Sequence, residues 1–302
     1  MGFEMKQEKD VLGLIPSKTQ GKACSSNSSS VNSPHNKNKK KKKDNKKKVV
    51  MTWRRKKTDS RAEEITAVRQ LLLTCKEVFS KGGPGVVPSE DKIQQLRGVL
   101  ENMKPEDVGL TPTMPFFRPI PGPSDGSSPR ITYLPLHECE QFSIAIFCLP
   151  PSGAIPLHNH PGMTVFSKLL FGTMHIKSYD WVVDAPLRDP KTRLAKLKMD
   201  STLTAPCNTS ILYPEDGGNM HRFTAKTACA VLDVLGPPYC NAEGRHCTYF
   251  LEFPLDKFSL EEDDVLRGQV EKEGRAWLQE RDDNPEDHNV VGALYGGPKV
   301  ED

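Results

Sequence analysis

The sequence contains no cysteine pair with the Cys-X-X-Cys spacing, although it has eight cysteines in 302 residues. Metal sites built from thiolates use such closely spaced pairs, and disulfide frameworks are typical of small secreted domains. The scattered cysteines therefore argue against a structural zinc site and against a disulfide framework. We expect most of them to be reduced and buried.

Long hydrophobic segments are also missing. No apolar run approaches the ~18 residues of a membrane-spanning helix, and the first residues lack the pattern of a secretory signal peptide. The apolar share is 36%, below the roughly 45–50% of an average domain, and low-complexity ends account for part of that deficit. We expect a soluble intracellular protein with no membrane contact.

Acidic residues are nearly absent from one stretch. Lys37 to Lys57 holds thirteen Lys or Arg and one Asp, so it carries a net +12. Because the whole chain carries +3, the remainder carries −9. The first 57 residues are rich in Ser, Asn and Lys, and little in them could pack, which predicts a disordered basic extension. The run Lys37–Lys48 is typical of a nuclear-import signal or a nucleic-acid patch, and a solvated tail is the alternative.

Two helices are predicted ahead of a long series of strands. Apolar residues at three-to-five spacing predict a helix between Ser60 and Ser80, and Ser89 is a typical N-cap for a second one. From Ile131 to Phe253 follow eight or more short segments rich in β-branched and aromatic residues, separated by turn residues. Such a series predicts a mainly β sandwich or barrel, with the helices as a scaffold packed on it.

Two finer predictions concern connections and the C-terminal part. Met163–Leu170 and Thr173–Trp181 are predicted to form a hairpin through Gly172. Ser259–Arg281 is predicted as one C-terminal helix with a thin apolar stripe. The predicted organisation is thus an extension over 1–57, one domain over 58–283 and a loose tail over 284–302, of which Val290, Val291, Leu294 and Tyr295 could dock on the barrel.

The segment Pro156-Leu-His-Asn-His-Pro-Gly contains the first candidate site. Side chains alternate along a strand, so His158 and His160 point the same way, with Cα atoms about 6.6 Å apart. That spacing lets both imidazoles bind one metal ion. Taken alone, His-X-His is as compatible with two polar residues at the end of a strand. A third histidine, His221, follows a Pro-Gly element, which consists of residues 214–218 with the sequence Pro-Glu-Asp-Gly-Gly.

These elements resemble the two cupin motifs. The first runs Gly, His-X-His, Glu and Gly, and the second runs Pro-X-Gly, His and Asn. Where the family has its glutamate, this chain has Thr164 or Val165, and Ala225 takes the place of the asparagine. The Pro-Gly element is one residue longer. The resemblance implies a double-stranded β-helix barrel whose metal is held by the three histidines without a carboxylate.

Other polar residues near these motifs have open roles. Asp233 lies between apolar residues in a predicted strand, where a carboxylate is costly unless paired. It is a candidate partner for a ligand histidine, a contact for a cationic substrate, or a paired core residue. The Gly-Pro-Pro turn that follows would place Tyr239 at the mouth of the barrel. We assign structural or surface roles to His175, His137 and His246.

A longer match narrows the family. Residues 149–163, Lys-Ser-Tyr-Asp-Trp at 177–181 and Asp-Val-Leu-Gly-Pro-Pro-Tyr at 233–239 closely resemble the plant cysteine oxidases, relatives of animal 2-aminoethanethiol dioxygenase, over roughly residues 60–257. The resemblance implies an Fe(II) dioxygenase that uses O2 to oxidise the N-terminal cysteine of proteins to its sulfinic acid. The oxidised terminus is then arginylated and the protein degraded, so that the enzyme acts as an oxygen sensor.

The resemblance also implies site residues and partners. His158, His160 and His221 correspond to the iron ligands, while Asp233, Tyr239 and Cys247 are implicated in substrate binding or turnover. In plants the substrates include ethylene-response transcription factors. The lysine-rich extension is similar to that of nuclear members, so we expect the protein in the nucleus and cytoplasm. We also expect a monomer that does not bind nucleic acid directly.

The ligand set is chemically consistent with thiol oxidation. A carboxylate with two histidines suits oxygenases that use an oxoacid, whereas three neutral imidazoles leave Fe(II) more positive, which favours a thiolate. As hypotheses, Asp233 attracts the substrate ammonium or the next basic residue, and Tyr239 donates a hydrogen bond to the reacting oxygen or sulfur. Two alternatives stay open: a dioxygenase of a free small thiol such as cysteamine, and a non-enzymatic metallo-cupin that acts as a nuclear binding module.

Overall fold

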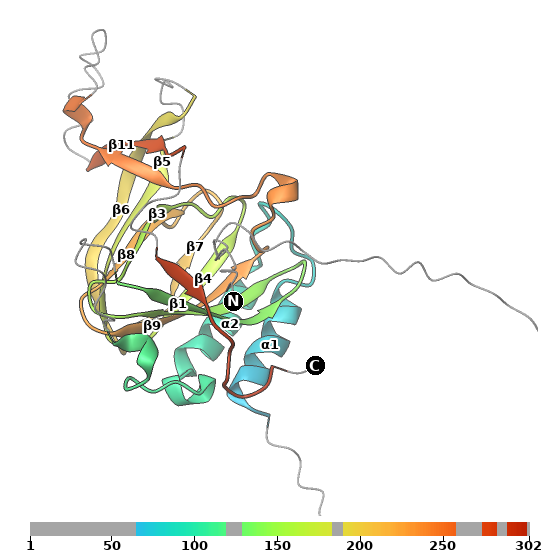
Figure 1. Cartoon of the computed structure of the whole chain (residues 1–302). Coiled ribbons are helices and arrows are strands. Elements are labelled where there is room, and N and C mark those ends of the chain that lie inside the picture. Colours follow the sequence, from blue (N-terminus) through green and yellow to red (C-terminus); the bar gives the residue numbers. More distant parts are fainter. Residues whose placement is uncertain (1–64, 119–128, 183–189, 258–273, 283–288, 301–302) are drawn as a thin grey trace, which may run out of the picture. The chain divides into compact units, whose positions relative to one another are not determined.

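The computed structural model describes residues 65–118, 129–182, 190–257, 274–282 and 289–300 (Figure 1). The predicted basic extension lies outside these ranges. Among the helices of this described part, none is long and apolar enough to cross a membrane. Strands predominate, as the sequence predicts.

The described strands form two six-stranded sheets. The first sheet has the order β12-β1-β2-β9-β4-β7 and the second the order β10-β11-β6-β5-β8-β3. Neighbouring strands are antiparallel except β1 and β12. The strands are β1 (Ile131–Glu138), β2 (Ser143–Leu149), β3 (Ala154–His158), β4 (Thr164–Phe171), β5 (Thr173–Trp181), β6 (Thr192–Thr204), β7 (Ser210–Leu212), β8 (Met220–Ala225), β9 (Cys229–Gly236), β10 (Phe250–Phe253), β11 (Arg275–Glu280) and β12 (Val290–Gly292).

The two sheets pack face to face as a nearly closed barrel, the double-stranded β-helix of cupins. One buried cluster joins Phe147 and Val231 of the first sheet to Ile155, Met174 and Phe223 of the second. Strand β9 is buried along its whole length, which explains its almost uninterrupted apolar sequence. Its side chains alternate between the barrel interior and the outer face of the first sheet.

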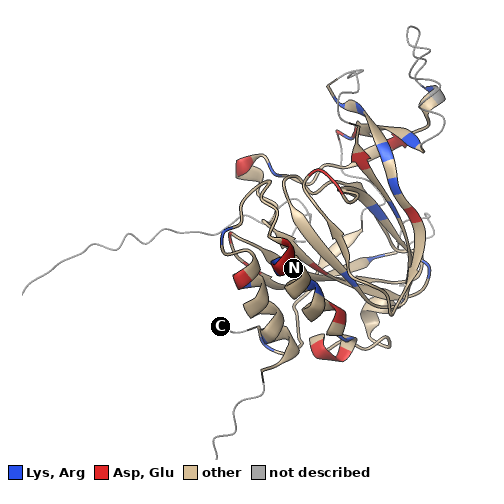
Figure 2. Cartoon of the chain, turned by 180° about the vertical axis from the view of Figure 1, so that it is seen from behind, with Lys and Arg blue, Asp and Glu red and all other residues tan. Residues whose placement is uncertain are grey.

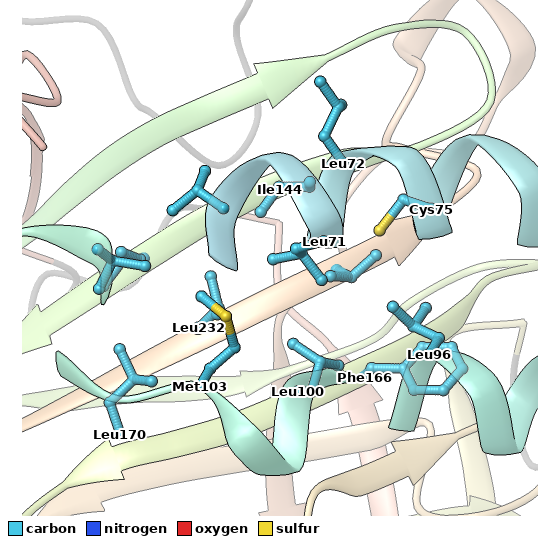
Figure 3. Packing of buried hydrophobic residues seen from close by; sticks show 14 of the residues in the cluster. Leu71, Leu72, Cys75, Leu96, Leu100, Met103, Ile144, Phe166, Leu170 and Leu232 are labelled. Atoms are coloured by element: carbon cyan, nitrogen blue, oxygen red, sulfur yellow. The ribbon is translucent and has the colours of Figure 1, made fainter. Parts of the chain in front are cut away.

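Two helices cover the outer face of the first sheet. Helix α1 (Ala67–Val78) begins at Thr66, whose hydroxyl accepts a hydrogen bond from the amide of Arg69, and α2 (Glu90–Asn102) begins after Ser89. Apolar side chains of both helices pack on the strands in one cluster that contains Leu71, Leu100, Ile144 and Leu232 (Figure 3). The predicted scaffold role is confirmed. Short 3-10 helices span Pro105–Val108, Pro115–Phe117, Asn241–Glu243 and Leu255–Lys257.

The outer face of the second sheet carries charged pairs. Figure 2 shows positive and negative residues along its long strands. Lys177 contacts Glu252 at 2.6 Å, and Nε2 of His175 lies 2.7 Å from Asp200. The structural role assigned to His175 is therefore confirmed.

The predicted hairpin between 163–170 and 173–181 is wrong. Strand β4 pairs with β7 and β9, whereas β5 pairs with β6 and β8 in the other sheet. The chain crosses between the sheets at Gly172, whose φ is +90°. A local sequence pattern predicts two strands and a turn, but it does not predict which strands pair. Two strands that are consecutive in sequence can therefore belong to different sheets, as β4 and β5 do.

We expect replacement of Gly172 with alanine to destabilise the fold by about 2–3 kcal/mol. Alanine rarely adopts this φ, and its Cβ would lie 2.2 Å from the carbonyl oxygen of Ala228. Urea unfolding measures the change. Gly98 of α2 is the matched control, because open space surrounds it and alanine there should stabilise by roughly 0.5–1 kcal/mol. Equal stability of Gly172→Ala and wild type would contradict the close crossing.

The predicted C-terminal helix is also wrong where the structure describes it. Residues 258–273 lie outside the described part, and Arg275–Glu280 forms β11 between β10 and β6. Gly274, with φ +61°, precedes the strand. Trp277 and Leu278 are both buried, and on adjacent strand positions they face opposite sides. Further on, Val290 docks on β1 as predicted, while Leu294 is 95% exposed.

Candidate metal centre

Two neighbouring strands bring the three predicted histidines together. His158 is the last residue of β3 and pairs with His221 on β8, and His160 lies just beyond the end of β3. The ring centroids are 4.8 to 4.9 Å apart. One nitrogen from each ring lies within 4.8 Å of the others, and all three residues are buried. The predicted cluster is thus formed, with the strand ending at His158 rather than continuing to His160.

Hydrogen bonds direct the Nε2 atoms toward one another. Nδ1 of His158 lies 2.8 Å from the carbonyl oxygen of Pro156, which only accepts, so Nδ1 carries the proton. The Tyr239 hydroxyl donates to the carbonyl of Asn159 at 2.7 Å and lies 3.0 Å from Nδ1 of His160, from which it accepts. The Nδ1–H tautomer places the ring lone pair of His158 and of His160 on Nε2, as is usual in metal-ligating histidines.

The electrostatics of the cluster favour a bound metal. Burial, reinforced by His221 and His158, lowers the pKa of His160 well below its usual value, and burial with His158 does the same for His221. Neutral imidazoles are the form that binds metals. Nε2 of His160 and Nε2 of His221 lie 3.1 Å apart, where two lone pairs repel unless a proton or a cation lies between them.

The donor set narrows the class of metal but not its identity. Three imidazole nitrogens suit a transition metal rather than calcium or magnesium. Within the described ranges, no carboxylate or cysteine joins the three histidines as a fourth member. Thr164 and Val165, the two residues where cupins have the glutamate, are both buried at the start of β4. The residues fit a three-histidine metal site.

Tyr239 and Cys247 meet beside His160. The Tyr239 ring lies 5.5 Å from the His160 ring, and the Cys247 thiol hydrogen-bonds to the hydroxyls of Tyr239 and Tyr249. Burial raises the pKa of Tyr239 well above its usual value and that of Cys247 to about 12. Both groups are thus protonated at neutral pH. Tyr239 holds the ring of the candidate ligand His160 by a hydrogen bond.

Asp233 lies in the barrel interior on β9. Its neighbour on β4 is Ser167, which hydrogen-bonds to its carboxylate, and its Oδ1 has no hydrogen-bond partner among the described residues. Burial raises its pKa to about 7. Within the described part of the chain, no hydrogen bond joins Asp233 to a histidine, so the structure does not support its role as the partner of a ligand histidine. The structure thus gives Asp233 a buried carboxylate oxygen without a hydrogen-bond partner among the described residues.

Several residues of the site were not predicted from the sequence. Asn159, between two ligands, binds the backbone of Thr248 through both its own amide and its side chain. Asn219, two residues before His221, binds the backbone of His160. Tyr249 lies just before β10, forms an isolated antiparallel bridge with His158 and reaches Cys247. The only available signal was the proximity of the two asparagines to the ligands in sequence.

The strand order and the three-histidine site define a metallo-cupin. The match to a solved RmlC-like cupin from Desulfovibrio desulfuricans covers 36% of this chain and 84% of that chain, with 21% identity and a TM-score of 0.26. Because this TM-score is low, the fold assignment is based on the strand order and not on this match. The family model PCO_ADO matches residues 99–300.

Curated relatives define the family further. Plant cysteine oxidase 1 of Arabidopsis thaliana is 78% identical over the full length of both chains. Plant cysteine oxidase 2 of the same plant is 58% identical over 82% of this chain and 89% of its own. Mouse 2-aminoethanethiol dioxygenase is 28% identical over 77% of this chain and 94% of its own. The chain belongs to the family of plant cysteine oxidases and 2-aminoethanethiol dioxygenases, and it is a thiol dioxygenase.

Proposed function

We propose that this enzyme uses Fe(II) and O2 to oxidise the N-terminal cysteine of target proteins to cysteine sulfinic acid. The oxidised terminus would mark those proteins for arginylation and degradation, so that their abundance reports oxygen. Ethylene-response transcription factors are the proposed substrates. The observation that carries the proposal is the buried cluster of three histidines, which no carboxylate joins within the described part of the chain. Asp233, on β9 of the same barrel, adds a buried carboxylate oxygen that has no hydrogen-bond partner among the described residues.

The reaction balances without a further reductant. One thiol and one O2 give one sulfinic acid: both oxygen atoms form bonds to sulfur, sulfur loses four electrons, and O2 gains them. Fe(II) held by Nε2 of the three histidines would supply a Lewis acid that favours the thiolate and brings it close to O2.

The protein residues have separate roles in this scheme. Tyr239 holds the His160 ring through Nδ1 and is itself held by the Asn159 carbonyl. Asp233 offers its free Oδ1 to the ammonium group of the substrate. An ammonium at that position would keep the carboxylate ionised, since a nearby positive charge lowers a carboxyl pKa. A requirement for a free α-amine follows from this arrangement.

We expect a peptide that begins with cysteine to gain about 32 Da, two oxygen atoms, when incubated in air with the Fe(II)-loaded protein. Mass spectrometry measures the gain, and an N-acetylated copy of the peptide is the matched control that should stay unchanged. Oxidation of cysteamine without change in the peptide would assign the enzyme to small thiols. No oxidation of either, with iron bound, would contradict the proposed activity.

A further inference from the structure

The side chain of Asn219 makes three hydrogen bonds in the wall of the metal centre. Its Oδ1 accepts the His160 amide at 3.1 Å, and its Nδ2 donates to the His160 carbonyl at 2.9 Å. The second Nδ2 proton goes to the carbonyl of Tyr213, also at 2.9 Å. The residue is 6% exposed. The buried side-chain amide of Asn219 therefore binds both the backbone N–H and the backbone carbonyl of His160.

Asn219 also precedes another ligand by two positions, because His221 follows at the start of β8. A displacement of Asn219 would therefore move one ligand through the chain and another through hydrogen bonds. The distance between Nε2 of His160 and Nε2 of His221 is only 3.1 Å. Small shifts at this distance change the geometry that a shared metal requires.

The loop that carries Asn219 is fixed in turn by Asp180. Its Oδ1 accepts the amides of Gly218 at 2.8 Å and of Asn219 at 3.0 Å. Gly218 has a φ of +88°, and a Cβ there would lie 2.4 Å from the Ser178 hydroxyl. Asp180 belongs to the motif Lys-Ser-Tyr-Asp-Trp, for which the catalytic scheme gives no role. It anchors the Pro-Gly element that is one residue longer than in other cupins.

We propose that Asn219 is a positioning residue that fixes His160 relative to His221 and thereby sets the metal affinity, and that Asp180 supports it through the loop. The side-chain amide of Asn219 satisfies all three partners, because its oxygen accepts from one donor and its NH2 group donates to two carbonyl oxygens. A carboxylate at this position has no proton to donate and would face two carbonyl oxygens. The inference rests on the metal-binding role of the three histidines. It does not depend on which metal or which thiol the enzyme uses.

The test is a titration of the metal-free full-length protein with Co(II), followed by its visible absorption bands and by competition with a chelator. We expect Asn219→Asp to weaken Co(II) binding by about 10–100-fold, as for other partners of metal ligands, and to change the absorption spectrum. Asp180→Ala should weaken it by roughly tenfold. Asp180→Asn should bind nearly as wild type does, because its Oδ1 still accepts both amides.

Asn102→Asp is the control, since it makes the same exchange at the exposed end of α2. A purely structural role would lower the melting temperature of the variants but leave Co(II) affinity unchanged well below that temperature. The proposal would be overturned if Asn219→Asp and Asp180→Ala both bind Co(II) with an affinity within about twofold of wild type. Such a change is smaller than the effect expected when a ligand loses its hydrogen-bond partner. If Asn219→Asp does not fold, the Asp180 pair decides alone. Failure of wild type to bind Co(II) would overturn the metal assignment itself, and with it the proposed function.

Discussion

Replacement of His221 with alanine is expected to abolish tight metal binding and thiol oxidation. The two remaining ligands lie on β3 and the turn after it, so the change removes the only nitrogen that β8 contributes to the described cluster. Loss of a mere partner of a ligand costs about 10–100-fold in metal affinity or activity, and loss of a ligand should exceed that. Metal analysis of the purified variant and its turnover of a cysteine peptide measure both effects.

His175→Ala is the matched control for this prediction. His175 lies on β5, next to the strand of His221, but its ring contacts Asp200 on the outer face of the sheet. Its removal costs at most an exposed ion pair, typically below about 1 kcal/mol. The control should therefore keep its metal and its activity. A His221→Ala variant that retains metal to the same extent would mean that the cluster is not the metal centre.

The three histidines were within reach of sequence analysis because they stand in recognisable motifs. The His-X-His spacing indicated His158 and His160, and the resemblance to the cupin motifs added His221. The contacts around them are non-local: Tyr239 is 79 residues from His160, and Asn219 is 59 residues from it. No periodicity connects such pairs. The sequence therefore named Tyr239 as a site residue but not its contact with His160, and it gave no role to Asn219.

The two wrong fold predictions have the same origin. The segments on either side of Gly172 were correctly predicted as strands, but their partners lie in different sheets. Arg275–Glu280 has apolar residues compatible with a helix or a strand, and the free edge of β6 decides in favour of pairing. Local propensity determines an element only when no tertiary partner competes for it.

Asp233→Asn is expected to make the folded protein more stable at pH 8, by on the order of 4 kcal/mol. Burial raises the pKa of Asp233 from its ordinary 3.8 to about 7, with Ser167 opposing the shift. The folded state thus holds this proton more tightly than the unfolded state. The stabilising contribution is complete below pH 4 and is lost as the pH rises through 7. Within the described part of the chain, the phenols of Tyr133 and Tyr239 interact electrostatically with Asp233.

Denaturant unfolding of wild type and Asp233→Asn at pH 4 and pH 8 measures this effect. The difference between the two proteins should be small at pH 4 and large at pH 8, because other titrating groups cancel in the comparison. Asp200→Asn, the same exchange at a partly exposed carboxylate, is the matched control. An equal difference at both pH values would mean that Asp233 is ionised in the fold without cost.

Turnover separates this stability effect from a role in substrate binding. A carboxylate that costs free energy when ionised is retained more readily if a cation compensates it, and its free Oδ1 is available for the substrate ammonium. Asp233→Asn should therefore keep its metal but turn over cysteine peptides at least about tenfold more slowly, the effect of losing one charge-assisted hydrogen bond. A stabilised variant with full turnover would show that the buried carboxylate does not bind the substrate amine.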